Sequence, residues 1–121
     1  MDKVTGGRAV VSGHILTDRA YIFAANERGA NFLLKNNDGK FYDVAFEYRV
    51  DDVIQKGRWT AFSDIYSRGR LDILSGNWLG YHRAYVLEKN EFKDIGNKAF
   101  DKPSRIRTII SADFDNDGFD E

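Results

Sequence analysis

The fold is decided by the stretch Arg70-Leu71-Asp72-Ile73-Leu74-Ser75-Gly76-Asn77-Trp78-Leu79-Gly80, because it has a counterpart earlier in the chain. A constant offset of 51 relates the two copies and begins where Ser12 aligns with Ser63. It pairs Arg19 with Arg70, Ile22 with Ile73, Asn26 with Asn77, Gly29 with Gly80, Phe41 with Phe92 and Asp43 with Asp94. An ungapped match of this length indicates an internal repeat with a period of about fifty residues.

Each copy contains four short runs rich in β-branched and aromatic residues and bounded by Gly, Asn or Asp, a pattern that predicts β-strands. The expected strands are 8–12, 21–26, 31–35 and 40–43 in the first copy, and 58–63, 71–77, 83–87 and 91–94 in the second. Asp38-Gly39 favours a tight hairpin, since both residues tolerate positive φ. Four strands per repeat are typical of a propeller blade. The sequence therefore predicts an all-β protein with two four-stranded antiparallel blades and the start of a third, as part of a larger β-propeller.

A third copy begins near Thr108, where an offset of 49 relates Asp64 to Asp113 and Gly69 to Gly118. The residues before Asp113, 107–112, form a β-branched run, which we expect to be a further strand.

The loop that follows, 113–121, carries five carboxylates and no basic residue. Acids at positions 1, 3, 5 and 9, with glycine at position 6, suit Ca²⁺, which takes roughly six to eight oxygen ligands from a flexible loop. The expected ligands are Asp113, Asp115, Asp117, the Phe119 carbonyl and Glu121. An EF-hand fits poorly, because no amphipathic helix precedes the loop and position 8 is acidic. The alternative is a solvated acidic tail that binds no ion.

The corresponding loops of the other two copies lack this ligand set. In the second copy Asp64 and Asp72 occupy positions 1 and 9, but positions 3 and 5 are Tyr66 and Arg68. We expect this loop to be metal-free, with Arg68 or Arg70 bridging the two acids in place of a cation. The two acids are thus interpreted as remnants of a ligand set and not as a general acid–base pair. The first copy offers no acid at positions 1, 3, 5 or 9.

Two further segments resemble a known family. The stretch 70–85 resembles the "DLD-hydrophobic-NWLG" segment of bacterial VCBS-repeat proteins and of relatives of the cartilage acidic protein, and 36–44 resembles the family's "NNGDGTFTDV" hairpin. A strand that leads into D-x-D-x-D-G-x-x-[DE] resembles the calcium loop of FG-GAP/VCBS-type repeats, which build integrin-α-like propellers. The resemblance covers nearly the whole chain from about Gly7. It implies a non-catalytic calcium-binding scaffold whose loops bind proteins or glycans. The alternative is the substrate-binding propeller of a carbohydrate-active enzyme or lectin.

The composition excludes several other classes of function. The chain has no Cys, so it forms neither a disulfide nor a thiolate metal site. No apolar run reaches the roughly eighteen residues of a membrane span, and the basic residues form no stripe of the kind that binds nucleic acid. No nucleophile elbow, zinc-protease motif or phosphate-binding loop indicates an enzyme. Trp78 lies between two expected strands and is a candidate for ligand contact, although tryptophans at such positions more often fill the space between blades.

The repeat also sets the expected organisation of the chain. Residues 1–6 are expected to be an N-terminal tail, 7–56 and 57–107 two complete repeats, and 108–121 the start of a third. Charged side chains at 47, 49, 51 and 52 predict an exposed connection between the repeats. Two blades leave apolar faces uncovered, so we expect self-association through these faces or marginal stability. The N-terminus carries no secretory signal, and we expect part of a longer exported protein, extracellular or at the cell surface, with the cytoplasm as the alternative.

Overall fold

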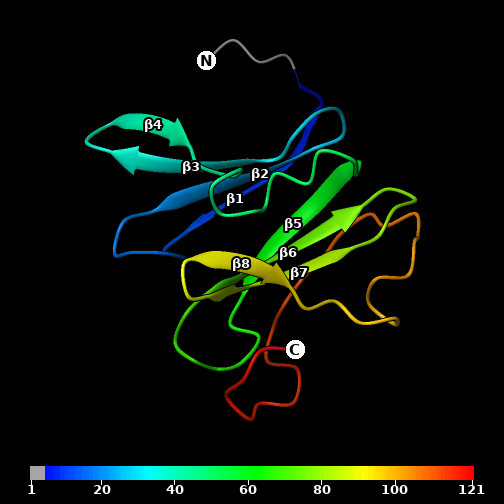
Figure 1. Cartoon of the computed structure of the whole chain (residues 1–121). Coiled ribbons are helices and arrows are strands. Elements are labelled where there is room, and N and C mark those ends of the chain that lie inside the picture. Colours follow the sequence, from blue (N-terminus) through cyan, green and yellow to red (C-terminus); the bar gives the residue numbers. More distant parts are fainter. Residues whose placement is uncertain (1–4) are drawn as a thin grey trace.

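The computed structural model describes residues 5–121, so residues 1–4 of the expected tail lie outside the described part. Within it, the chain forms two four-stranded antiparallel sheets and no helix (Figure 1). Blade 1 consists of β1 (Gly7–Gly13), β2 (Tyr21–Asn26), β3 (Phe32–Asn37) and β4 (Lys40–Asp43), in that order. Blade 2 consists of β5 (Gly57–Ser63), β6 (Asp72–Asn77), β7 (Arg83–Glu88) and β8 (Glu91–Asp94). The predicted all-β fold with two four-stranded blades is confirmed.

The strands of the two blades end within two residues of the predicted limits. Asp38 and Gly39 adopt φ values of 51° and 84° between β3 and β4, as a primed hairpin turn requires. No helix in residues 5–121 has the length and apolarity that crossing a membrane requires.

The two blades repeat the same side-chain bonds at the end of their second strands. Asn31 Oδ1 accepts the backbone N–H of Asn26 at 3.0 Å, and His82 Nδ1 accepts that of Asn77 at 3.1 Å. The Asn26 and Asn77 side chains both donate to the carbonyl four residues ahead, at 2.6 Å in each case. The offset of 51 therefore describes corresponding positions from β2 to β4 and from β6 to β8.

The first strands of the blades follow a different offset. β1 pairs Gly7 with Asn26 and Ser12 with Ile22, whereas β5 pairs Gly57 with Asn77 and Phe62 with Ile73. β1 and β5 are thus related by 50 residues, and the predicted alignment of Ser12 with Ser63 is wrong by one residue. The additional residue of blade 2 lies in the loop after the first strand, which spans 14–20 in blade 1 and 64–71 in blade 2. A loop absorbs one residue at little cost, whereas a slip within a strand would turn its buried side chains outward.

The hydrophobic core lies between the blades, where β5 packs against β1 and β2. Phe23 and Leu33 of blade 1 and Ile73 of blade 2 are fully buried there. The connection 44–56 enters this core, because Val50 is also fully buried. The predicted exposure of the connection is wrong for Asp52, whose side chain is only 6% exposed. The carbonyl of Tyr48 accepts the N–H of Phe92 at 3.1 Å, which ties the connection to β8.

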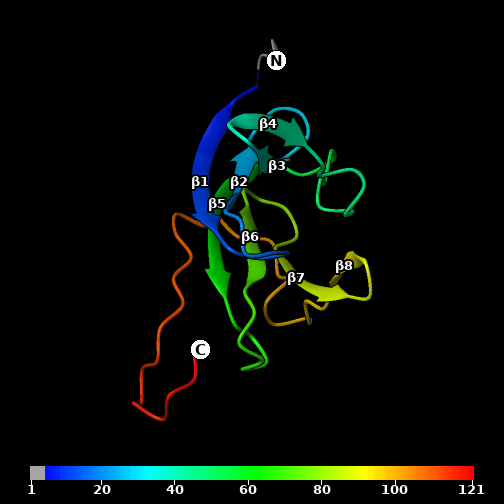
Figure 2. The same cartoon turned by 90° about the vertical axis from the view of Figure 1, so that its left-hand side faces the viewer.

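The segment 105–112 contains no strand, and the prediction of one at 107–112 is wrong. It runs beside β5 and β6 (Figure 2), with Ile106 and Ile109 against Gly76 and a hydrogen bond of 2.7 Å between the Ser111 and Ser63 hydroxyls. It packs on blade 2 much as β5 packs on blade 1. A strand needs a partner that completes its ladder of backbone hydrogen bonds. Among residues 5–121 none pairs with this segment as β6 pairs with β5.

Candidate functional site

The acidic loop 113–121 folds into a compact turn that gathers its first three acids. The backbone N–H groups of Asp117 and Gly118 donate to the Asp113 carboxylate at 3.1 and 2.8 Å. Asn116 and Gly118 adopt positive φ values of 62° and 93°, which allow the chain to turn back on itself. One ligand oxygen each from Asp113, Asp115 and Asp117 lies within 4.8 Å of the other two.

The remaining two predicted ligand residues close this loop. The Glu121 carboxylate accepts the N–H of Phe114 at 3.0 Å, and the Glu121 N–H donates to the Ala112 carbonyl at 3.0 Å. Glu121 is therefore held beside the start of the loop. Phe119 lies in the turn itself, where its N–H donates to Asp117 at 2.9 Å. The donor set consists of hard oxygen atoms, which is the chemistry that Ca²⁺ prefers.

The loop between β5 and β6 has the same backbone arrangement without the acids at positions 3 and 5. The N–H groups of Arg68 and Gly69 donate to the two oxygens of Asp64, as those of the corresponding residues 117 and 118 donate to residue 113. Ser67 and Gly69 have positive φ values of 52° and 70°. The backbone hydrogen bond from Arg68 lowers the pKa of Asp64. The carboxylate at position 1 therefore accepts backbone hydrogen bonds and stabilises the turn in both copies.

In this second loop a guanidinium group contacts the acid at position 9. Arg68 donates to the two oxygens of Asp72 at 3.0 and 3.3 Å. The Asp72 side chain is fully buried, and burial raises its pKa while Arg68 opposes that rise. Arg70 contacts neither acid through its guanidinium and donates to the Leu87 carbonyl at 2.8 Å. Arg68 is thus the arginine that occupies the predicted place of a cation, and it reaches Asp64 only through its backbone N–H.

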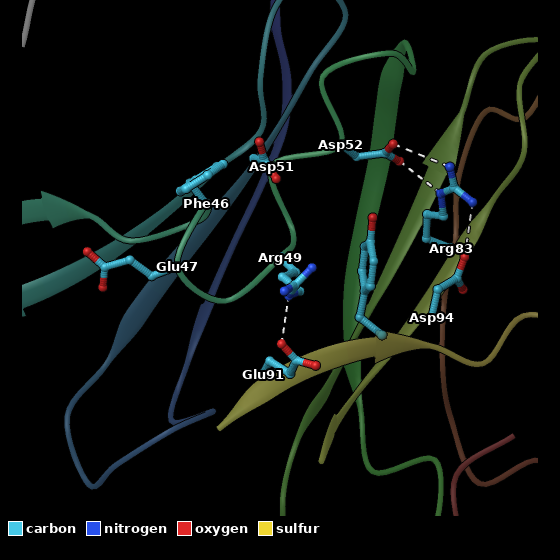
Figure 3. Close-up of a pocket in the computed structure, with 9 residues that line it drawn as sticks. Phe46, Glu47, Arg49, Asp51, Asp52, Arg83, Glu91 and Asp94 are labelled. Atoms are coloured by element: carbon cyan, nitrogen blue, oxygen red, sulfur yellow. Dashed lines mark hydrogen bonds and ion pairs between the residues drawn. The ribbon is translucent and has the colours of Figure 1, made fainter. Parts of the chain in front are cut away.

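A cleft of about 550 Å³ opens between the connection 44–56 and blade 2 (Figure 3). Arg83 lies between Asp52 and Asp94 on its floor, with its Nε 3.0 Å from Asp52 and one terminal nitrogen 3.0 Å from Asp94. The hydrogen bond that Arg83 donates to Asp52 raises the pKa of Arg83. Arg49 and Glu91, which also line the cleft, form a second ion pair at 2.6 Å.

The charges of the cleft do not cancel. Five acids and two arginines line it together with two aromatic residues: Glu47, Asp51, Asp52, Glu91, Asp94, Arg49, Arg83, Phe46 and Tyr85. Both arginines are ion-paired, so the cleft presents a net negative charge beside Phe46, which is 81% exposed. The sequence analysis did not predict this cleft. The charged cluster at 47, 49, 51 and 52, which lines it, is the feature that could have indicated it.

Trp78 is half-buried beside blade 2 and already has partners within the protein. The guanidinium carbons of Arg58 and Arg107 lie 4.7 and 5.1 Å from its ring centroid. Its backbone N–H donates to the Lys56 carbonyl at 2.8 Å. A ligand that stacks on Trp78 has to share the ring with these arginines.

Comparison with known proteins agrees with the repeat that the two blades form. Residues 64–121 match the FG-GAP-like repeat family. The chain is 47% identical to human cartilage acidic protein 1 over 123 aligned positions, which cover 97% of the chain and 19% of that relative. The relatives of the same name from Xenopus tropicalis and Mus musculus are each 46% identical over 123 positions, with the same coverage.

The chain is therefore an FG-GAP repeat protein with propeller-type blades. Within that class it is related to cartilage acidic protein 1. It spans about a fifth of the length of these curated relatives, since it covers 19% of each. The resemblance seen in the stretch 70–85 is confirmed.

Proposed function

We propose that the chain is a non-catalytic, calcium-binding pair of propeller blades that presents loops and a cleft for binding proteins or glycans. The single observation that carries the calcium assignment is the gathering of Asp113, Asp115 and Asp117 carboxylates within 4.8 Å. Like charges repel at this distance, and a divalent cation among them removes the repulsion.

The loop between β5 and β6 supports the proposal independently. It shares the backbone turn of the acidic loop, and a guanidinium contacts its position 9 acid. A positive group is therefore present in the copy that keeps the acids at positions 1 and 9 but lacks those at positions 3 and 5. The bound ion would be held by Asp113, Asp115, Asp117, the Phe119 carbonyl and Glu121, and would supply the positive charge that Arg68 supplies in blade 2.

The proposed partners follow from the cleft between the blades and from the relatives. The acidic cleft beside Phe46 suits a cationic or hydroxyl-rich group on a protein or glycan, because unpaired carboxylates are strong hydrogen-bond acceptors. The name of the relatives associates them with cartilage. We therefore infer an extracellular setting for this chain, as part of a longer protein.

Calorimetric titration of Ca²⁺ into the chain and into Asp117→Ala tests the metal assignment. We expect saturable binding on the order of 10⁻⁴ M, as in extracellular modules, and weaker binding of Mg²⁺, which demands octahedral geometry. Asp117→Ala should abolish the binding. Asp120→Ala is the matched control, because it removes one acid from the same loop at a position outside the ligand set. Equal calcium heats from Asp117→Ala and wild type, or equal losses in both variants, would contradict the site.

A further inference from the structure

Three arginines occupy corresponding positions in successive repeats. Arg8 and Arg58 lie at the β-bulges of β1 and β5, where the strand register shifts between Gly7 and Ala9 and between Gly57 and Trp59. The offset of 49 that relates the second loop to the third carries this position on to Arg107. The three arginines therefore occupy the same position in each of the three copies.

Between Arg8 and Arg58 stands a carboxylate. Glu27 forms ion pairs with Arg8 of its own blade and with Arg58 of the next, the latter at 3.2 Å. The hydrogen bond from Arg8 lowers the pKa of Glu27. One acid thus neutralises part of the charge of two successive arginines.

The corresponding position in blade 2 holds an aromatic ring. Trp78 lies 51 residues after Glu27. The backbone N–H of Glu27 donates to the Gly6 carbonyl at 2.8 Å, and that of Trp78 donates to the Lys56 carbonyl at the same 2.8 Å. Trp78 contacts the arginines on both sides in the same way, Arg58 from its own blade and Arg107 from the following segment. The site is therefore a copy of the Glu27 site in which the carboxylate is replaced by an indole.

This replacement leaves hydrogen-bond donors without acceptors. A guanidinium contacts an aromatic ring through its flat face, while its five N–H groups point outward along its edge. No residue in 5–121 supplies a carboxylate to the exposed Arg107. The Nε of Arg58 is buried and also lacks an acceptor in this part of the chain.

We propose that Arg58, Arg107 and Trp78 form an oxyanion site that takes a sulfate or phosphate group of a ligand. The group would accept hydrogen bonds from the edge of Arg107 and lie beside the indole, in the positive field of both guanidinium groups. It would supply the negative charge that Glu27 supplies in the first copy. This site is separate from the acidic loop and from the acidic cleft, and it favours the opposite charge.

Sodium sulfate titrated at constant ionic strength against sodium chloride tests the proposal, with the indole N–H resonances of both tryptophans as reporters. We expect saturable shifts at Trp78 and none at Trp59. Arg107→Gln should weaken binding about tenfold, the loss typical of one charge-assisted hydrogen bond. Arg19→Gln is the matched control, since it removes the same charge from an exposed arginine that pairs with Asp38 elsewhere.

Two reciprocal variants sharpen the test. Trp78→Glu installs the carboxylate of the first copy and should abolish sulfate binding, while Glu27→Gln should create a second site between Arg8 and Arg58. Calorimetric titration of sulfate measures both variants, because Trp78→Glu removes the indole reporter and calorimetry counts the sites in Glu27→Gln. Hexose 6-sulfate and hexose 6-phosphate then distinguish a sulfated from a phosphorylated source of the group. Unchanged binding in Arg107→Gln, equal weakening in Arg19→Gln, or no saturable shift in wild type would overturn the proposal. Arg107 is exposed, so its variant remains informative even if Trp78→Glu fails to fold.

Discussion

Arg68 holds Asp72 at 3.0 Å in the same loop geometry in which the third copy has Asp117 and Glu121. The backbone turn is common to both loops, because backbone N–H groups donate hydrogen bonds to Asp64 in one and to Asp113 in the other. The turn therefore forms with either charge at position 5. The side chain at this position then decides whether the loop is neutralised from within or needs an ion.

Exchanging two side chains should convert the loop of blade 2 into a calcium site. Tyr66→Asp with Arg68→Asp places acids at positions 3 and 5, while Asp64, Gly69 and Asp72 already occupy positions 1, 6 and 9. The exchange is best made in the Asp117→Ala background, which removes the acidic-loop site. Calcium at about ten times the dissociation constant should then add roughly 1.4 kcal/mol to the free energy of unfolding. An unchanged melting temperature with calcium would show that the two loops do not correspond.

Removing Arg68 alone should destabilise the chain in a pH-dependent way. Arg68→Ala leaves the buried Asp72 carboxylate without its ion partner, at an expected cost of about 2 kcal/mol near neutral pH. Burial raises the pKa of Asp72 above its ordinary 3.8, so the folded state binds the proton more readily than the unfolded state. The loss in free energy of unfolding of Arg68→Ala relative to wild type should therefore shrink as the pH falls through the folded pKa toward 3.8. Urea unfolding at both ends of this range measures it.

Asp72→Asn provides the control for that experiment. Added to Arg68→Ala, it removes the buried charge and should recover part of the stability at neutral pH. A deficit that is the same at all pH values and unaffected by Asp72→Asn would assign the loss to packing of the Arg68 side chain.

His82 should make blade 2 sensitive to acid. Its Nδ1 accepts the Asn77 N–H, so the ring proton is on Nε2, which lies 2.9 Å from the Ser104 hydroxyl. Burial lowers the pKa of His82 below 6.5, so its contribution to stability is present above pH 6.5 and is lost as the pH falls through the folded pKa. Protonation of Nδ1 removes the acceptor for Asn77.

His82→Asn should abolish this acid sensitivity, because blade 1 uses Asn31 as the acceptor at the same position. His82→Ala, which has no acceptor, should lose about 1–2 kcal/mol at neutral pH. Chemical unfolding measures the free energy of unfolding of the three proteins from about pH 5 to 8, the range in which histidine titrates. An asparagine variant with the pH dependence of wild type would assign the sensitivity to another group.

The isolated chain should self-associate or melt at low temperature. Val10 on blade 1 is 69% exposed and Ile110 on the terminal segment is 67% exposed, and the segment 105–112 lacks the strand pairing that β5 has. Hydrogen exchange should be fastest from about residue 105 onward, because local opening there breaks few backbone hydrogen bonds. Sedimentation at several concentrations measures the association. A compact monomer with a high, concentration-independent melting temperature would contradict it.

Sequence reasoning predicted the strands because turn residues and the repeat agreed on their limits. Asp38-Gly39 marked one hairpin directly, and the offset of 51 transferred the strand pattern from one copy to the other. It failed at 107–112, since β-branched composition cannot show whether a pairing strand is present. It also placed the first strands one residue out of register, because a strict offset has no means to locate an extra loop residue.

The candidate sites divide in the same way. The acidic loop and the Arg68–Asp72 contact could be predicted, because their residues are close in sequence and their spacing is set by a single turn. The cleft and the arginines around Trp78 could not, since their residues come from segments that lie far apart in the sequence. Arg8, Arg58 and Arg107 recur at offsets of 50 and 49, a signal that an alignment fixed at 51 conceals.

The extra residue in the loop 64–71 also shows where this scaffold accommodates changes in length. β1 and β5 keep matching registers with β2 and β6 although the loops that join them differ by one residue. Peptides grafted at the exposed residues 17–20, which leaves the buried Ile15 in place, should therefore be displayed at the end of the sheet without disturbing strand pairing. The blade pair thus offers a defined insertion point for engineering new recognition segments, one blade at a time.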